Sequence, residues 1–334
     1  TLPGVMTTGA LQTLLRSYRV VPGRRVVIAG NGPLNLQVAV ELARAGAQLV
    51  AVAEAAAPPW SAPAPALIGM AAASPRLARD GVMMLAELKR RGVPVRFRSV
   101  LKRLDSVAEG IAVTMRSADR PADDEMIVDV VGIGYGFSPR SEILGLIGCR
   151  VRRDPAGGRL IAETDDDGRT SVPEVFAAGD CVGLGGAAAA ALAGTLAGRA
   201  AAGDLRVGVE PGAGIDAALR RQLAVVRRFQ ANLWRVYRPQ VEIAEGLQAD
   251  ALACRCEEVS HGELAVANGG PIGNLKRLTR AGMGRCQGRY CERTALTVAG
   301  DADVAGGWLP GGAPRPPVTP TSIGTFAELE LTDD

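Results

Sequence analysis

Four of the six cysteines lie in two tight pairs near the end of the chain, Cys254-Arg-Cys256 and Cys286-Gln-Gly-Arg-Tyr-Cys291. Each spacing allows both thiolates of a pair to reach one metal centre, and four thiolates from two loops are what a [2Fe–2S] cluster requires. A structural zinc site can also use four cysteines, but its pairs are usually spaced C-x2–4-C, and C-x-C is tight for a tetrahedral ion. We therefore interpret Cys254, Cys256, Cys286 and Cys291 as cluster ligands, with zinc or ordinary thiols as the alternatives.

The residues around these pairs favour the cluster. Basic side chains in or beside the pairs would offset the negative charge of a four-thiolate iron–sulfur centre; they are Arg255, Lys276, Arg277, Arg285 and Arg289. Glycines at positions 282, 284 and 288 leave backbone N–H groups free to approach sulfur, which is one of the factors that set a cluster's potential.

A second pattern with chemical meaning is a dinucleotide fingerprint between a predicted strand and a predicted helix. The apolar run 25–29 reads as a buried parallel strand, and Gly30-Asn-Gly-Pro-Leu-Asn35 follows it. Gly30 permits the tight turn, Gly32 lets the backbone approach a pyrophosphate, and Pro33 suits the first helical position. The N-terminus of the helix that follows, over 33–45, would supply free N–H groups and a favourable dipole.

The end of the next predicted strand, 48–53, carries the acidic residue of such a fingerprint. Glu54 stands about where a ribose-binding carboxylate is expected and indicates NAD rather than NADP. Asn35 departs from the pattern, because Gly or Ala normally occupies the third position so that helix and strand pack closely. The sequence therefore predicts an NAD site, with a vestigial Rossmann unit as the alternative.

The stretch from Thr170 to Asp180 is a third motif. It resembles the late FAD motif of flavoproteins related to the pyridine-nucleotide-disulphide reductases, T-x-x-P-x-hydrophobic-[FY]-A-x-G-D. The resemblance implies a buried strand ending at Gly179 beside the flavin, with Asp180 accepting a hydrogen bond from a ribityl hydroxyl. The helix starting at Gly186 would face the pyrophosphate or the flavin ring. An ordinary strand–turn–helix with a capping aspartate is the alternative.

The cysteine region carries a broader resemblance. The segments 254–259, 276–284 and 286–291 are similar to the bacterioferritin-associated-ferredoxin-like module, a small helical [2Fe–2S] domain. Its form here resembles the one that closes the flavoprotein A (alpha) subunits of opine oxidases, with similar subunits in hydrogen cyanide synthase and D-hydroxyproline dehydrogenase. The resemblance extends over nearly the whole chain, from Thr1 through the tail.

In that family the opening phrase Thr1-Leu-Pro-Gly-Val-Met follows an N-terminal Rossmann half with its own glycine fingerprint. The chain starts at this phrase without an initiator methionine, so we expect a fragment that lacks the N-terminal FAD half. The strand 127–134, which ends in Gly134, resembles the strand that leads out of the NAD domain in two-dinucleotide-domain flavoproteins.

The expected fold is α/β, with a Rossmann-like NAD(P)-binding domain, the remnant of an FAD-binding domain and a small all-α [2Fe–2S] module. We divide the chain accordingly into the trailing part of an FAD domain (1–20), the NAD(P) domain (21–139), the C-terminal part of the FAD domain (140–205), a linker helix (206–247), the cluster domain (248–300) and an extended tail (301–334).

Within this division we expect a short helix around 10–18, an Ala/Pro-rich loop over 55–75, a helix over about 76–91 and hairpin strands over 93–104 and 111–115. An amphipathic helix is expected over 216–237. Ser260 and Glu263 have capping-box spacing and should start the first helix of the cluster domain.

Composition excludes several functions. A chain of 334 residues with a net charge of +3 and 4% aromatic residues offers neither a basic surface nor a stacking platform for nucleic acid. No apolar run approaches the ~18–20 residues of a membrane span. Paired cysteines without a secretory signal indicate a reducing compartment, so we expect a cytoplasmic protein or one at the periphery of the inner membrane.

Other reactive residues are more simply explained as structural. His261, the only histidine, falls in a helix first turn and is expected to face solvent. Cys149 and Cys181 lack the spacing of a redox pair. The acidic run 165–167 reads as a polar turn. We assign no catalytic residue in this chain.

The family resemblance implies an electron-transfer flavoprotein subunit that carries FAD and a [2Fe–2S] cluster, with NAD as a further candidate cofactor. Its expected partners are a substrate-oxidising flavoprotein subunit of the D-amino-acid-oxidase-like type and a small ferredoxin-like subunit. Two alternatives stay open: a stand-alone NAD(P)H-dependent flavin and iron–sulfur reductase, and a non-enzymatic iron–sulfur docking module.

Overall fold

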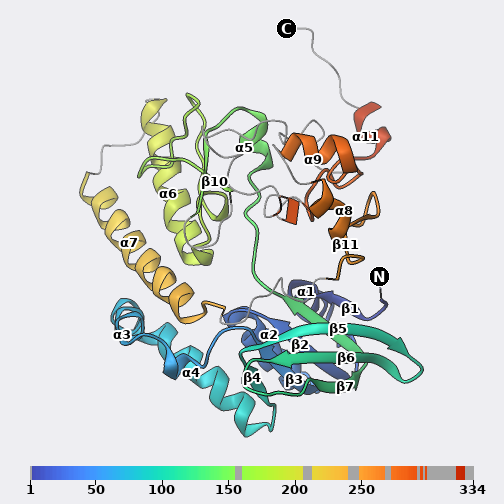
Figure 1. Ribbon diagram of the computed structural model, residues 1–334. Helices are drawn as coiled ribbons and strands as arrows, with labels where there is room; N and C mark the ends of the chain where they lie inside the picture. Colours follow the sequence, from blue (N-terminus) through green and yellow to red (C-terminus); the bar gives the residue numbers. More distant parts are fainter. Residues whose placement is uncertain are drawn as a thin grey trace. The chain divides into compact units, whose positions relative to one another are not determined.

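The computed structural model describes residues 2–154, 160–205, 213–239, 248–267, 272–291, 294–295, 298 and 321–327 (Figure 1). Contacts divide the chain into two compact units. The first comprises Thr1–Phe137 and Arg221–Gly246, and the second comprises Ser138–Arg220 and Leu247–Asp334.

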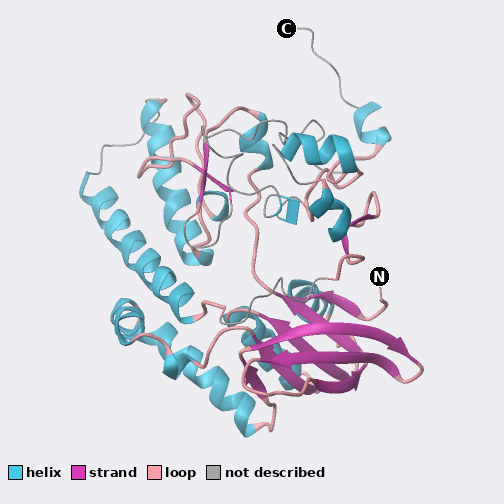
Figure 2. Ribbon diagram, in the orientation of Figure 1, coloured by secondary structure: helices cyan, strands magenta, loops and turns pink. Residues whose placement is uncertain are grey.

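The first unit is built on a five-stranded parallel sheet, whose strands are among those drawn in magenta in Figure 2. The strand order is β1-β8-β2-β3-β4. Its strands are β1 (Val5–Thr7), β2 (Arg25–Gly30), β3 (Gln48–Glu54), β4 (Val95–Phe97) and β8 (Val130–Gly134). The central strands β2, β3 and β8 are nearly continuous apolar runs, as strands covered on both faces should be. This sheet confirms the predicted Rossmann-like α/β architecture of the region.

Helices cover one face of this sheet. They are α1 (Thr8–Tyr18), α2 (Pro33–Arg44) and α4 (Pro75–Arg90), and α2 packs against both of the others. The apolar side chains of α2 meet alternate residues of β2 and β3, including Val26, Ile28 and Val52, in a core from which water is excluded. The helices expected over 10–18, 33–45 and 76–91 are thereby confirmed to within two residues at each end.

An antiparallel three-stranded sheet covers the other face. It consists of β5 (Ser99–Val107), β6 (Gly110–Ser117) and β7 (Asp124–Val128), in the order β5-β6-β7. The second core lies between the sheets and joins Val27, Ala29 and Val131 to Ile111 and Met115. Alternate residues of each parallel strand therefore face opposite layers, which fixes the register of the strands.

Three segments of this unit differ from the sequence-based expectation. The run 93–104 was expected to be one hairpin strand, but it is divided between β4 of the parallel sheet and β5 of the antiparallel sheet, with Arg98 at a φ of 50° between them. The stretch 55–75 was expected to be a loop, but it contains the 3-10 turn η1 (Pro59–Ser61) and the helix α3 (Ala64–Ala73). Its alanines, leucine and methionine favour a helix, and proline in the first turn costs no hydrogen bond there. A high proline and alanine content therefore did not distinguish a loop from a helix that begins with proline.

The strand expected over 127–134 is two strands, β7 and β8, which belong to different sheets and are separated by Asp129. The Asp129 carboxylate accepts hydrogen bonds from the backbone N–H of Arg24 and of Arg25, and from the Arg25 guanidinium at 2.7 Å. These bonds hold the chain where it passes from one sheet to the other.

The amphipathic helix predicted over 216–237 is confirmed as α7 (Ala213–Val236). Its part from Arg221 onward belongs to the first unit, where Leu223, Phe229 and Val236 are buried. These residues are among those whose spacing of three and four predicted an amphipathic helix.

The second unit contains α5 (Glu142–Leu146), β9 (Val151–Arg153), β10 (Leu160–Ala162), the turn η2 (Asp180–Val182) and α6 (Gly186–Asp204). β9 and β10 form an antiparallel pair. The buried strand expected before Gly179 is absent among the described residues, where a single bridge between Arg169 and Phe176 takes its place. A strand forms only where neighbouring strands satisfy its backbone, and no other described strand pairs with this segment.

The tail 301–334 was expected to be extended, but it contains the short helix α11 (Ile323–Ala327), and its residues 301–320 and 328–334 lie outside the described part of the chain. The cysteine region of the second unit holds β11 (Leu252–Cys254), β12 (Val259–Ser260), α8 (His261–Val266) and α9 (Ile272–Thr279). It was expected to be all-α, but β11 and β12 form a short antiparallel pair, because Glu258 adopts a φ of 54° and reverses the chain. The capping box at α8 is confirmed: Ser260 accepts from the Glu263 N–H, and the Glu263 carboxylate accepts from the Ser260 N–H. Within the described residues, no helix is both long and apolar enough to span a bilayer.

Candidate functional sites

The glycine-rich turn of the first unit forms where the ends of β2 and β8 approach closely. A Cβ atom at Gly30 would lie 2.1 Å from the Gly134 carbonyl oxygen, so only glycine fits at the end of β2. The same carbonyl oxygen accepts a hydrogen bond of 2.9 Å from the Asn31 N–H. Gly32 then caps α2 with a φ of 105°, and Pro33 is the first helical residue, as the fingerprint predicted.

Asn35 crosslinks this turn. Its side chain is 1% exposed, donates to the Gly134 carbonyl at 2.8 Å and accepts from the Thr8 hydroxyl at 2.8 Å. A Cβ at Gly134 would clash with the Asn35 Oδ1 atom at 2.4 Å, so the space that a glycine or alanine at position 35 would leave is provided by Gly134 instead. The departure at Asn35 is therefore compatible with close packing of α2 on the sheet.

Glu54 lies at the end of β3 and is fully buried. One carboxylate oxygen accepts from the Gly32 N–H at 2.9 Å, and the other accepts from the Ala56 N–H at 3.0 Å. Burial raises the pKa of Glu54 to about 7, against the opposing effect of these backbone hydrogen bonds. The residue expected to bind a ribose thus points its carboxylate at the chain's own backbone.

Residues 232–239, which we call the cover segment, lie over this turn. The Asn31 side chain donates to the Tyr237 carbonyl at 2.9 Å, and Pro239 pairs with Ala56 in an isolated β-bridge. The Trp234 ring lies 3.7 Å from the position of a Cβ at Gly32. Burial and the charge of Glu54 raise the pKa of Tyr237, which is consistent with its ring lying near that carboxylate.

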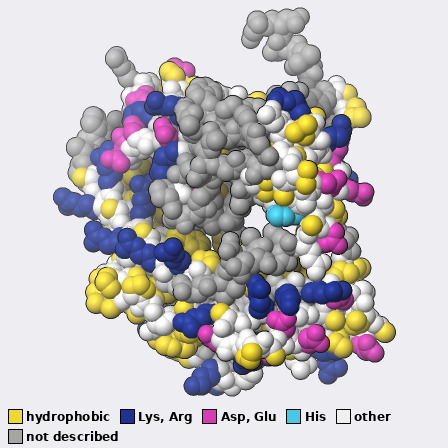
Figure 3. All heavy atoms as spheres, in the orientation of Figure 1, with side chains coloured by type: hydrophobic (Ala, Val, Ile, Leu, Met, Phe, Trp, Pro, Cys, Tyr) yellow, Lys and Arg dark blue, Asp and Glu magenta, His cyan; other side chains and the backbone are white. Residues whose placement is uncertain are grey.

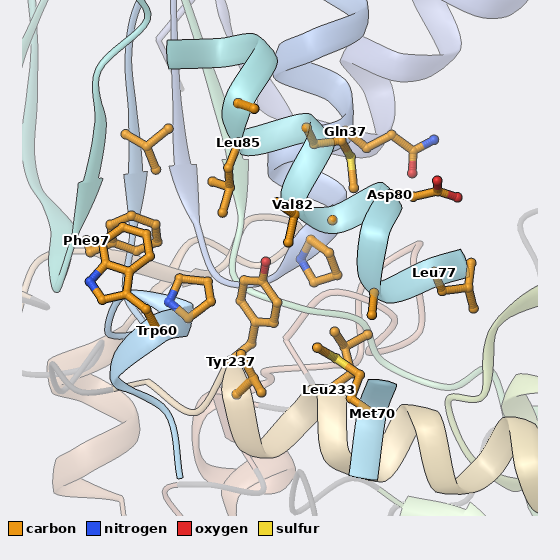
Figure 4. A pocket seen from close by; sticks show the side chains of 18 of the residues that line it. Gln37, Trp60, Met70, Leu77, Asp80, Val82, Leu85, Phe97, Leu233 and Tyr237 are labelled. Carbon is orange, nitrogen blue, oxygen red and sulfur yellow. The ribbon is translucent and has the colours of Figure 1, made fainter. Parts of the chain in front are cut away.

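An apolar cavity of about 1120 Å³ opens beside the cover segment (Figure 4). Leu233 enters it from α7 and Tyr237 from the position directly after that helix. The rings of Trp60 and Phe97 stand edge to face at its other side, with centroids 5.5 Å apart. Of the fingerprint, only Pro33 is among the described residues that line it; Gly30, Gly32 and Glu54 are not. The cavity therefore reaches the start of α2 but not Gly30, Gly32 or Glu54.

The late FAD motif in the second unit forms a chain of tight turns. Gly179, Gly183 and Gly186 all have positive φ. Gly179 lies beside α6, where a Cβ added to it would be 3.6 Å from the Ala190 Cβ atom. Asp180 starts the turn η2 and is exposed, and among the described residues its carboxylate has no hydrogen-bond or ion-pair partner. The motif leaves a carboxylate available beside the first turns of a helix, as binding of a ribityl hydroxyl would require.

The four cysteines of the two motifs approach one another as two pairs, each with one cysteine from the first motif and one from the second. The Cys256 thiol hydrogen-bonds with Cys286, and the Cys254 thiol hydrogen-bonds with Cys291. Burial opposes ionisation of Cys286, but Cys256 and backbone N–H groups lower its pKa below the usual value. Burial, together with the neighbouring Cys254, raises the pKa of Cys291 to about 12.

The loop around Cys286 has the backbone geometry of an anion cradle. Gln287 and Gly288 have positive φ, and the N–H groups of residues 288–290 lie close enough to the Cys286 side chain to lower its pKa, while the Arg289 N–H also donates to the Cys286 carbonyl at 3.3 Å. Gly284 fits closely against Cys256, where a Cβ would lie 2.3 Å from the cysteine Cβ atom. Four thiols and N–H donors to sulfur fit the ligand chemistry of an iron–sulfur centre. Over the described residues, however, no three metal-binding side chains already surround one point.

The remaining reactive residues lie at the surface or make local structural contacts. The imidazole of His261 is half-exposed at the start of α8 and is visible at the surface in Figure 3. The Cys149 thiol is buried and lies 3.4 Å from the Thr170 hydroxyl, and the Cys181 thiol donates to the Ala178 carbonyl. Asp165 caps its own turn by accepting from the N–H groups of Asp167 and Arg169, as expected for a polar turn.

Comparison with known proteins identifies the family. The model of the pyridine nucleotide-disulphide oxidoreductases matches residues 3–195. The chain belongs to this family. It is 34% identical over 344 residues to the A-subunit of opine oxidase from Rhizobium meliloti (strain 1021), and this match covers 98% of the chain and 72% of that protein. It is also 34% identical over 352 residues to the HcnB subunit of hydrogen cyanide synthase from Pseudomonas aeruginosa, with the same coverage.

Among solved structures, L-proline dehydrogenase from P. horikoshii has a similar fold, with a TM-score of 0.56 and 19% identity. That match covers 97% of this oxidoreductase and 54% of the dehydrogenase chain, so the chain spans about half of that protein's length. The predicted family and the predicted oxidoreductase class are confirmed. Membership implies a flavin cofactor, whereas the iron–sulfur cluster and the individual site residues stay predictions.

Sequence reasoning missed three residues around the glycine-rich turn of the first unit: Thr8, Trp234 and Tyr237. The periodicity of α7 predicted that one of its faces is buried, but not that its end lies over the fingerprint. Thr8 gave no signal, because its partner Asn35 is distant in sequence and read only as an exception to the glycine pattern.

We expect Asn35→Ala to lower the free energy of unfolding by about 1–3 kcal/mol, because the buried Thr8 hydroxyl loses its acceptor. Asn35→Asp should cost at least as much, since it places a second acceptor against the Gly134 carbonyl in a buried site. Urea denaturation measures both. Gln37→Ala on the same helix is the control and should stay within about 1 kcal/mol of wild type; equal losses for all three variants would contradict the crosslink.

Because the folded pKa of Glu54 is raised above that of an unfolded chain, its contribution to stability is greatest at low pH and is lost as pH rises toward about 7. The difference in unfolding free energy between wild type and Glu54→Gln should fall by about 1.4 kcal/mol per pH unit between pH ~4.5 and ~7. Urea titrations across this range measure it. Glu125→Gln, at an exposed carboxyl on β7, should show no such slope; a flat difference for Glu54→Gln would contradict the raised pKa.

Proposed function

We propose that this chain is the electron-transfer flavoprotein subunit of a multi-subunit dehydrogenase that oxidises CH–NH or CH–NH2 donors such as opines, glycine or imino acids. Electrons pass between FAD and a [2Fe–2S] cluster on this subunit. The observation that carries the proposal is the pairing of four thiols across two motifs, in a chain whose family implies a flavin. The names of its relatives, subunits of opine oxidase and of hydrogen cyanide synthase, support it.

When bound, a flavin exchanges electrons in pairs or singly and an iron–sulfur cluster exchanges them singly, so together they join a two-electron donor to a one-electron acceptor. The residues of this chain would bind the two cofactors and adjust their reduction potentials. Cys254, Cys256, Cys286 and Cys291 would hold the cluster, and the N–H groups of residues 288–290 would adjust its potential through hydrogen bonds to sulfur. Asp180 would orient the flavin through a ribityl hydroxyl.

Oxidation of the substrate itself we assign to a partner subunit of the D-amino-acid-oxidase-like type, and the second expected partner is a small ferredoxin-like subunit. The sole histidine is half-exposed at a helix start, and the buried Glu54 is occupied by backbone hydrogen bonds. Neither is positioned to act in general base catalysis, and a division of labour between subunits agrees with this.

The cluster assignment predicts the metal content of the chain purified anaerobically with its partners. We expect about two irons and two acid-labile sulfides per chain, and a paramagnetic signal after reduction. Cys286→Ser should remove that signal, because it replaces one of the four thiolates. Cys149→Ser, whose hydroxyl can keep the contact with Thr170, is the matched control and should retain the signal. Zinc without sulfide would contradict the proposal.

The flavin assignment predicts that Asp180→Asn binds FAD more weakly, by roughly ten- to a hundredfold, because a hydrogen bond to a charged group is lost. The dissociation constant can be measured by fluorescence during reconstitution of the flavin-free complex. Asp166→Asn removes another exposed carboxylate of the same unit and should leave the constant unchanged. Equal constants for wild type and Asp180→Asn would remove Asp180 from the flavin site.

A further inference from the structure

The dinucleotide fold of this chain has the groups that usually bind NAD, but these groups form hydrogen bonds within the chain itself. A pyrophosphate needs free N–H groups at the glycine-rich turn, and a ribose needs an accessible carboxylate at the end of the second strand. Here the Gly32 N–H donates to Glu54 at 2.9 Å, and the second Glu54 oxygen is taken by the Ala56 N–H. Glu54 is 0% exposed, so no hydroxyl can approach it without rearrangement.

The cover segment also contacts the glycine-rich turn and the residues that follow Glu54. The Tyr237 carbonyl accepts from the Asn31 side chain, Pro239 is bridged to Ala56, and the Trp234 ring lies 3.7 Å from where a Cβ at Gly32 would stand. Each of these contacts falls on the turn itself or on the residues directly after Glu54. The cover segment therefore occupies the surface that the phosphates and the adjoining ribose of a dinucleotide would need.

Packing holds the cover segment in place. Val236 and Tyr237 are 4% and 6% exposed and belong to the same core as Ile28 and Leu36. Asn232, which precedes them on α7, is 6% exposed and fits against Gly69 of α3, where a Cβ would lie 2.6 Å from its amide nitrogen. Displacing the segment would expose apolar surface and break the polar contacts to Asn31 and Ala56 together.

The open cavity beside the segment does not replace the lost site. Its lining is apolar apart from a few side chains at its rim, of which Lys89 and Asp80 are the charged ones among the described residues. It includes neither Glu54 nor the two glycines of the turn. A dianionic pyrophosphate would find there one lysine, opposed by one aspartate, in place of a row of N–H groups.

We infer that the dinucleotide fold of this chain binds its own cover segment in place of a nicotinamide dinucleotide, so that neither NADH nor NADPH donates electrons to this subunit. The Rossmann unit then serves as a scaffold for the subunit. This inference is independent of the flavin and cluster assignments, and it separates the electron-transfer subunit from a stand-alone NAD(P)H reductase.

Calorimetric titration of the full chain, purified with its partners, tests the inference with NADH and then with NADPH. We expect no saturable binding up to about 1 mM, the upper end of ordinary Michaelis constants, and no bleaching of bound flavin. Saturable binding below that concentration, or bleaching by either nucleotide, would overturn the inference. Flavin and iron contents measured on the same sample report separately on the proposed function.

Removing the cover should create the missing affinity. The double variant Trp234→Ala with Tyr237→Ala is expected to bind NADH with a dissociation constant of about 0.1 mM or less, at least tenfold below the ~1 mM at which the wild type still shows no binding. Trp60→Ala, which removes an exposed ring at the far side of the cavity, should bind no more than wild type. A double variant that is folded by circular dichroism and still binds no NADH would show that the cover is not what excludes the nucleotide.

Hydrogen exchange on the unaltered protein keeps the inference testable if the double variant does not fold. We expect slow exchange at the Asn31 and Gly32 amides without any ligand, and no change in exchange over residues 30–36 or 232–238 when 2 mM NADH, about twice that upper limit, is added. Rapid exchange at the turn, or new protection in either segment on adding NADH, would contradict a seated cover.

Discussion

The close approach of two strand ends is the constraint on which the first unit depends. A Cβ at Gly30 would clash with the Gly134 carbonyl, and a Cβ at Gly134 would clash with the Asn35 and Thr8 side chains. The Asn35 amide on α2 joins Gly134, at the end of β8, to Thr8 at the start of α1. This arrangement fixes where α2 begins and therefore where the Gly32 N–H points. Glu54, at the end of the neighbouring strand, accepts that N–H and needs no ligand to do so.

In the cysteine region of the second unit, the thiols lie at the centre and the only described sheet is the short pair β11 and β12. The thiols approach one another across two loops, and positive φ angles at Glu258, Gln287 and Gly288 turn the chain so that N–H groups surround Cys286. The core of this region is small and includes Cys254 and Cys291 themselves. A bound metal would add stability to a module in which so few of the described side chains are buried, and the proposed cluster would supply it.

The sequence predicted the parts of the structure that local chemistry controls. The turn at Gly30, the proline start of α2, the end of β3 at Glu54 and the capping box at Ser260 all follow from residue type and spacing over a few positions. It did not predict the strand break at Asp129, which depends on Arg24 and Arg25 over a hundred residues earlier. Nor did it predict the cover of the fingerprint by Tyr237, since amphipathic spacing states that a helix is buried but not against what.

The strand expected before Gly179 is a case in which local composition predicted an element that does not form. The residues 175–178 have the composition of a buried strand, but a strand needs partners, and among the described residues only the bridge from Arg169 to Phe176 is formed. The glycines and Asp180 that follow nevertheless adopt the tight turns that the motif implies. Turn geometry is set by glycine locally, whereas strand pairing is set by the rest of the domain.

The central claim is that electrons pass between a flavin and an iron–sulfur cluster on this subunit. Its most direct test is a stepwise anaerobic reduction of the complete complex, one electron at a time, with the flavin absorbance and the paramagnetic signal of the cluster recorded together. We predict that both centres take up electrons and re-equilibrate after each addition, whichever is reduced first. Flavin that is reduced fully while no cluster signal appears at any stage would contradict the account.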